Sequence, residues 1–174
     1  MLTTRSVLLS ARALAQQRLE SSLYGLRHGF NVYDEEDMRN EVAVVQPALF
    51  LVTAHIVPAQ VTLPFIALEV TDVRPYLLEM GSTAGRTREI RFHVYGKNLA
   101  QRDDLAEYLA NPDVILRVPI HDYDGHYDDP ALLETGKIDY SQTLNVRPTI
   151  EPEAYFEGSW RYRRIVRLVL VTVQ

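Results

Sequence analysis

The sequence contains no cysteine among its 174 residues, and this absence excludes several classes of protein. Disulfide-stabilised folds, thiol catalysis and metal sites with cysteine ligands all need that residue. Long apolar runs are also missing. The longest, residues 48–57, is interrupted by Thr53 and His55 and is about half as long as a membrane helix. No unbroken apolar run follows the N-terminal arginines. We therefore expect a soluble protein without a targeting or membrane segment.

An excess of positive charge is absent as well. The formal net charge is −5, which argues against a protein that coats nucleic acid. Apolar residues make up 47% of the chain and charged residues 24%, as in ordinary globular proteins. The length favours one domain, residues 1–174, with a sizeable core.

The pattern along the chain predicts an α+β fold. The predicted parts are a helix at 4–28, a β-rich core at 42–97, a helix at 98–111, an acidic loop at 121–136 and a strand at 160–173. Because strands are grouped rather than alternating with helices, we expect a mostly antiparallel sheet packed by the N-terminal helix and the central helix.

Two helices show apolar residues at spacings of three and four. Asn98 is the expected N-cap of the second helix. The first stripe is Val7, Leu8, Ala11, Leu14, Ala15, Leu19, Ser22, Leu23 and Leu26, and the second is Leu99, Leu105, Ala106 and Leu109.

Strand predictions rest on alternation and on β-branched residues. Apolar and polar residues alternate strictly in 88–96, which indicates a strand with one solvent-exposed face. His93 lies on that face and is interpreted as a surface or interface histidine. Both parities are apolar in 160–173, which predicts a central strand covered on both faces. Shorter strands are expected at 42–45, 48–57, 61–70, 114–120 and 138–146.

The loop that starts at His121 holds the candidate metal ligands. His121, Asp122, Asp124 and His126 have suitable side chains, but an EF-hand that starts at Asp122 would need its closing Glu where Leu133 stands. A solvated acidic loop is therefore favoured over a metal site. No nucleophile elbow, zinc-protease motif or P-loop occurs, so we expect no catalytic residue, no cofactor and no bound metal.

Arginines cluster around two of the predicted strands. One cluster contains Arg86, Arg88 and Arg91, and the other contains Arg161, Arg163, Arg164 and Arg167. Residues 98–130 carry a net charge of −6, whereas residues 137–174 carry +2. Opposite patches suit a head-to-tail ring of identical subunits, which we favour over binding to nucleic acid. The candidate interface residues are Arg161, Arg163, Arg164, Arg167, Arg88, Arg91, Asp122 and Asp124.

Residues 63–110 resemble a known family. They read L-P-F-I-A-L-E-V, then L-E-M-G-S, then R-E-I-R-F-H-V-Y-G-K-N-L-A-Q-R-D-D-L-A-E-Y-L-A. With the helix before them and the arginine-rich strand after them, they resemble the tail terminators and other neck or tail-completion proteins of tailed bacteriophages. The insert 121–158 departs from the shortest members.

The resemblance implies a structural virion protein, assembled in the host cytoplasm and without enzymatic activity. It implies a ring, usually a hexamer, that ends the tail tube and presents a face to the head connector, with DNA passing through the lumen without specific binding. A head-completion or stopper protein is the alternative within this class. A small enzyme that uses the Asp/His loop and a ligand-binding module are the alternatives from other classes.

Overall fold

The computed structural model describes residues 4–20, 30–52, 57, 61–77, 84–110, 121–123, 137–138, 146–150 and 163–173. The helices are α1 (Thr4–Glu20), α2 (Glu35–Arg39) and α3 (Leu99–Ala110). The strands are β1 (Asn31–Tyr33), β2 (Ala48–Phe50), β3 (Phe65–Leu77), β4 (Ala84–Tyr95), β5 (His121–Asp122), β6 (Lys137–Ile138), β7 (Val146–Ile150) and β8 (Arg163–Val173).

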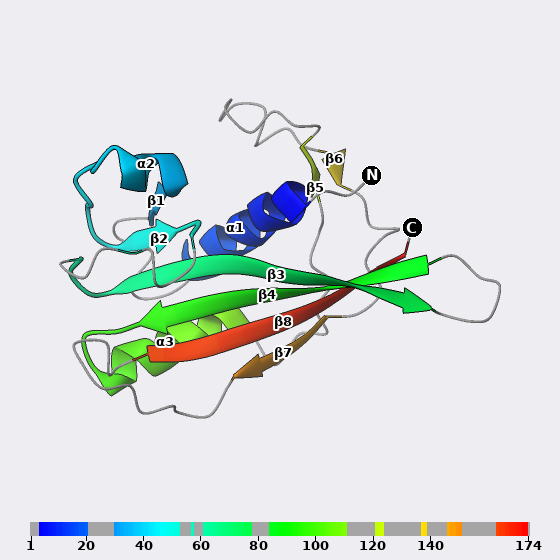
Figure 1. Cartoon of the computed structure of the whole chain (residues 1–174). Helices are drawn as coiled ribbons and strands as arrows, with labels where there is room; N and C mark the ends of the chain where they lie inside the picture. Colours follow the sequence, from blue (N-terminus) through cyan, green and yellow to red (C-terminus); the bar gives the residue numbers. More distant parts are fainter. Residues whose placement is uncertain are drawn as a thin grey trace.

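A mixed sheet dominates the fold (Figure 1). Its strand order is β1-β2-β3-β4-β8-β7, and β5 pairs with β6 in a second, two-stranded sheet. The pairings β1–β2 and β2–β3 are parallel, whereas β3–β4, β4–β8 and β7–β8 are antiparallel. The three long strands β3, β4 and β8 are antiparallel to one another, which confirms the predicted α+β fold with a mostly antiparallel sheet.

The main core lies between the sheet and the helices α1 and α3. Even-numbered side chains of β3 at 66–70, of β4 at 88–94 and of β8 at 164–168 point to this side, because alternate residues of a strand face opposite ways. The buried residues from the sheet are Leu49, Leu51, Ile66, Leu68, Ile90, Phe92, Val94, Val166 and Leu168, and those from the helices are Val7, Ala11, Leu14, Ala15, Leu19, Leu105, Ala106, Leu109 and Ala110. The described part of both helical stripes is therefore confirmed, apart from Leu99, which is 52% exposed.

Helix α3 begins and ends with side-chain contacts. The Asn98 side-chain oxygen accepts a hydrogen bond from the Gln101 backbone N–H at 2.9 Å, so the predicted N-cap is confirmed. At the other end, Arg18 of α1 donates to the carbonyl of Leu109, one of the last carbonyls of the helix. The turn into α3 is tight, since a Cβ on Gly96 would lie 2.6 Å from the backbone nitrogen of Arg102.

Several strand boundaries differ from the sequence predictions. The strand expected at 42–45 is wrong: Val42 donates its N–H to the Asp37 carbonyl and Val45 donates its N–H to the Tyr33 hydroxyl, so the segment joins no ladder. The place beside β2 is taken by β1, which the sequence did not predict. Strand β2 ends at Phe50, before the expected position 57. Strand β3 starts after Pro64 and runs on to Leu77.

Other predictions fall wholly or partly outside the described residues. The first helix is observed to Glu20, and its expected extension to 28 lies outside them, as do the strand at 114–120 and most of the loop at 121–136. The C-terminal strand is confirmed as β8, between β4 and β7. Its helix-facing side is buried, whereas Ile165, Arg167 and Val169 on the other side are only half-buried, so the described residues do not show the expected cover on both faces.

Candidate assembly interface

The sheet face opposite α1 and α3 is called the open face here, and it has two unlike halves. The aromatic half consists of Tyr33, Phe50, Phe65 and Tyr95, whose rings form a chain across β1, β2, β3 and β4 with centroid distances of 4.5–5.5 Å. Side chains of the segment 38–63 pack against it, namely Met38, Val44, Val61 and Leu63. The charged half consists of Glu69, Glu89, Arg91, His93 and Arg167.

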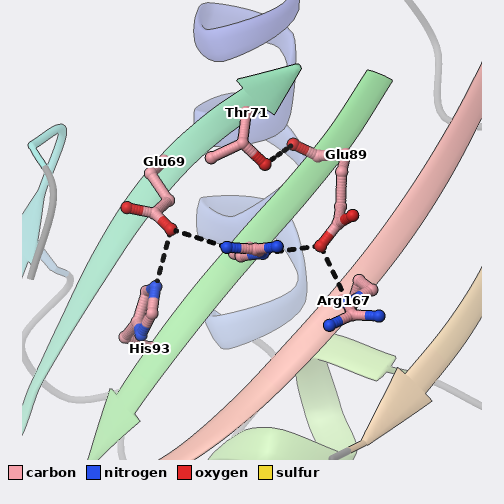
Figure 2. Close-up of polar contacts among 6 residues, drawn as sticks. Glu69, Thr71, Glu89, His93 and Arg167 are labelled. Carbon is pink, nitrogen blue, oxygen red and sulfur yellow. Dashed lines mark hydrogen bonds and ion pairs between the residues drawn. The ribbon is translucent and has the colours of Figure 1, made fainter. Parts of the chain in front are cut away.

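The charged half is held together by contacts across three strands (Figure 2). The Glu89 carboxylate accepts a hydrogen bond from Arg91 Nε at 2.5 Å and forms an ion pair with Arg167, whose Nε lies 2.8 Å from Glu89 Oε1. On β3, Glu69 Oε1 lies 3.1 Å from His93 Nε2 and 3.7 Å from Arg91 Nη1. Arg91 and Arg167 are directly opposite each other in the β4–β8 register, where like charges repel. The carboxylate of Glu89 bridges them and offsets that repulsion.

His93 is buried at the inner end of this network. Its side chain is 8% exposed and that of Glu69 13%, so His93 is not a surface histidine, and the alternative of an interface histidine stays a prediction. Burial lowers the pKa of His93. The hydrogen bond and the charge attraction between its ring and the Glu69 carboxylate act in the opposite direction, and the positive charges of Arg163 and Arg91 lower the pKa further. With the His93 imidazole neutral, the charges of the two arginines and the two glutamates of the charged half cancel, so its five residues carry no net charge.

The arginines of β8 do not form one cluster, because alternate residues face opposite sides of the sheet. Arg163 and Arg167 are on the open face. Arg164 is on the helix side, where its Nη1 lies 2.8 Å from Asp103 Oδ1, and the same oxygen accepts from Arg102. Arg164 therefore ties β8 to α3 within the chain, and because its side chain is still 24% exposed, its place in an interface stays a prediction.

Arg163 and Arg88 also differ in position. Arg163 pairs in register with Tyr95, and their side chains are hydrogen-bonded. Burial is the main reason why the pKa of Tyr95 is raised. Arg88 is only 2% exposed and belongs to the helix-facing parity of β4, so it offers no guanidinium surface to a partner. Of the arginines around β4, Arg91 is the one placed on the open face.

The remaining candidate residues belong to the acidic loop and to the start of the last strand. Asp124 and Arg161 lie outside the described residues, and Asp122 pairs in register with Lys137 between β5 and β6. What holds β5 was not predicted from the sequence. Ser10 Oγ accepts the N–H of His121 at 2.9 Å, so the insert starts against α1. The signal was a pair of serines, Ser6 and Ser10, one turn apart on the buried side of an amphipathic helix.

The acidic residues 34–37 form a helix start that sequence reasoning missed. The Asp34 carboxylate accepts from the backbone of Glu36 and Asp37, and Asp37 reaches back to the Asp34 N–H. This reciprocal pair is a capping box, and it nucleates α2. Glu35 pairs with Arg39 at 2.8 Å on the exposed side.

The described residues show little that is suited to catalysis. A cavity of about 360 Å³ lies between the start of α1 and α2, but the carboxylates of Asp34 and Glu35 that line it already cap a helix and pair with Arg39. Among the described residues, no three His, Asp or Glu side chains come together as metal ligands. Within the same ranges, no helix is long and apolar enough to cross a membrane.

Comparisons with known proteins show only distant likeness. No protein-family model matches the chain, and no curated protein matches it. One similar solved structure is a chain titled "Virion of native gene transfer agent (GTA) particle", with a TM-score of 0.45 and 14% identity. The match covers 93% of this chain and 92% of that one. A likeness of this degree does not assign a function.

Proposed function

We propose that the chain is a structural subunit of a tailed-phage virion and forms a ring, a hexamer, at the end of the tail. In this role it terminates the tail tube and joins it to the head connector. The resemblance of residues 63–110 to the tail terminator group supports the proposal. The proposed role needs neither a cofactor nor a catalytic residue.

The observation that carries the proposal is the charged half of the open face. α1 and α3 cover one face of the sheet, whereas on the other face the described residues cover the aromatic half and not the charged half. Burying a charge in an interface is costly unless it is paired. Because Glu89 already pairs with Arg91 and Arg167, another subunit can cover this surface without burying an isolated charge.

Assembly with the tail tube tests this function. The purified chain is mixed with growing tubes of the tail-tube protein from the same phage, and tube lengths and ends are measured by electron microscopy. We expect rings at one end of each tube and an arrest of growth at one ring per tube. Tubes that keep growing without rings would contradict a terminator. Binding to the head connector alone would identify a head-completion or stopper protein instead.

A further inference from the structure

Two surfaces of opposite charge lie at opposite edges of the sheet. One is the α2 segment, residues 34–45, whose first eight residues hold five carboxylates and one guanidinium. The other is called the arginine surface. It consists of Arg91, Arg163, Ile165, Arg167 and Val169, together with the carboxylates of Glu69 and Glu89 that pair with these arginines. α2 follows β1 at one edge, whereas β8 lies next to the other edge (Figure 1). Four strand spacings separate β1 from β8, about 19 Å.

Both surfaces combine charge with apolar side chains. Val42 is 42% exposed and Val45 is 59% exposed, and both belong to the α2 segment. On β8, Ile165 and Val169 are half-buried on the same face as the arginines. Interfaces that last need an apolar part as well as complementary charge. The two surfaces match in both respects.

The carboxylates of the α2 segment differ in the contacts that they make within the chain. Asp34 and Asp37 cap the helix, and Glu35 pairs with Arg39. Glu36 and Glu41 are exposed, and within the described part of the chain their side chains form no ion pair. These two carboxylates are therefore the ones available to a cation of another molecule.

We infer that the α2 segment of one copy docks on the arginine surface of the next copy. This inference rests on the proposed ring and names the two surfaces that build it. The contact is head-to-tail because the surfaces differ and lie at opposite edges, and repetition of such a contact closes a ring when the rotation allows it. Nucleic acid is a poorer occupant, since Glu69 and Glu89 offset two of the three guanidiniums.

Charge reversal on each surface, alone and mixed, tests the contact. The variants are Glu36→Lys with Glu41→Lys for the α2 segment, and Arg163→Glu for the arginine surface. Glu107→Lys, an exposed reversal on α3, is the matched control. Association is measured by sedimentation velocity at low salt. We expect each reversed variant to associate at least about tenfold more weakly, and the control to associate like the wild type.

An equimolar mixture of the two reversed variants is the decisive sample. The reversed α2 segment of one variant meets the reversed surface of the other, and the unchanged surfaces meet as in the wild type. We therefore expect the mixture to assemble, with an even number of subunits, which also shows that both variants are folded. Added salt weakens all of these contacts by screening.

Each result decides the inference separately from the proposed function. Rings that form equally well from either reversed variant overturn the inference and leave the proposed function in place. A wild-type chain that is monomeric at every concentration also overturns it, and tube capping then decides the function. If Arg163→Glu unfolds by circular dichroism, Arg167→Gln replaces it, with a smaller weakening expected. Loss of DNA binding with unchanged assembly assigns the arginine surface to nucleic acid and overturns the inference.

Discussion

The aromatic half and the charged half of the open face share strands β3 and β4, yet they have opposite character. Phe65 and Tyr95 are register partners, and so are Glu69 and Arg91. The two rows are four residues apart, about 13 Å along each strand. Side chains of the segment 38–63 cover the aromatic row, whereas the side chains of the charged half are 8–37% exposed.

This difference shows that the cover, and not the strand pattern, determines the role of each half. Where another segment of the chain excludes water, aromatic rings bury apolar area and stabilise the fold. Where no such segment packs within the described residues, the side chains pair with one another and stay near the surface. The aromatic half therefore contributes mainly to stability, and the charged half mainly to contact with other molecules.

Shortening one side chain of the aromatic half and one that lies next to the charged half tests this comparison most directly. Phe65 is fully buried and stacks on Tyr95, so Phe65→Ala is expected to lower the free energy of unfolding by about 3–5 kcal/mol. Thr71 lies on the same strand and face beside Glu89, and Thr71→Ala is expected to cost less than about 1 kcal/mol. Chemical denaturation measures both. Equal losses would show that the charged half is part of the core.

Neighbouring positions of β8 provide a second test, because they separate its two faces. Arg164→Glu places a carboxylate against Asp103, which keeps its ion pair with Arg102, and the loss of the Arg164 pair together with the new repulsion is expected to cost about 1–3 kcal/mol of stability. Arg167→Gln on the open face is expected to cost less than about 1 kcal/mol and to act on assembly instead. Unfolding curves and sedimentation of both variants check this. An Arg164→Glu variant that is as stable as the wild type but fails to assemble would show that Arg164 takes part in the interface.

Much of the fold was predictable from the sequence, because one-dimensional periodicity carries it. Alternation in β4 and the stripes of α1 and α3 follow directly from which side of an element faces the core. β1 has three residues and α2 has five, so neither is long enough to show a period. The capping pattern from Asp34 to Asp37 was the available signal for α2.

The candidate interface was predictable only in part. The arginines of β8 stand together in the sequence, but the strand sends Arg164 to the helix side and Arg163 to the open face. The partner of each arginine comes from another strand or helix, such as Glu89 or Asp103. Those pairings depend on the register between strands, and the pattern of residues along one strand does not contain that information. The burial of His93 was not predictable for the same reason, since it depends on neighbouring strands.

Within the charged half, Glu89→Gln sharpens the comparison further. It removes the carboxylate that bridges Arg91 and Arg167, so the two opposed guanidiniums are expected to repel each other. Because both are about one-third exposed, the expected loss of stability is about 0.5–1 kcal/mol. A double-mutant cycle with Arg167→Gln measures the coupling, which high salt is expected to reduce. A coupling of zero at low salt would mean that the bridge contributes nothing.

The smallest expected effect is a dependence of stability on pH that belongs to His93. Its pKa is lowered in the folded chain mainly by burial, and Arg163 and Arg91 add to this while Glu69 opposes it. In the unfolded chain the pKa is about 6.5, so below that pH the unfolded state binds more protons than the folded state. The stabilisation is therefore complete above pH 6.5 and is lost as the pH falls below it.

His93→Gln removes this titration and keeps an N–H that can donate to Glu69. We expect the variant to unfold within about 1 kcal/mol of the wild type at pH 7. Between pH 7 and pH 5.5 the wild type is expected to lose more stability than the variant, since the other histidines are common to both proteins. Urea denaturation at a series of pH values measures the two slopes. Parallel slopes would show that the imidazole is as easily protonated in the folded chain as in the unfolded one, and that the charged half gives it no cover.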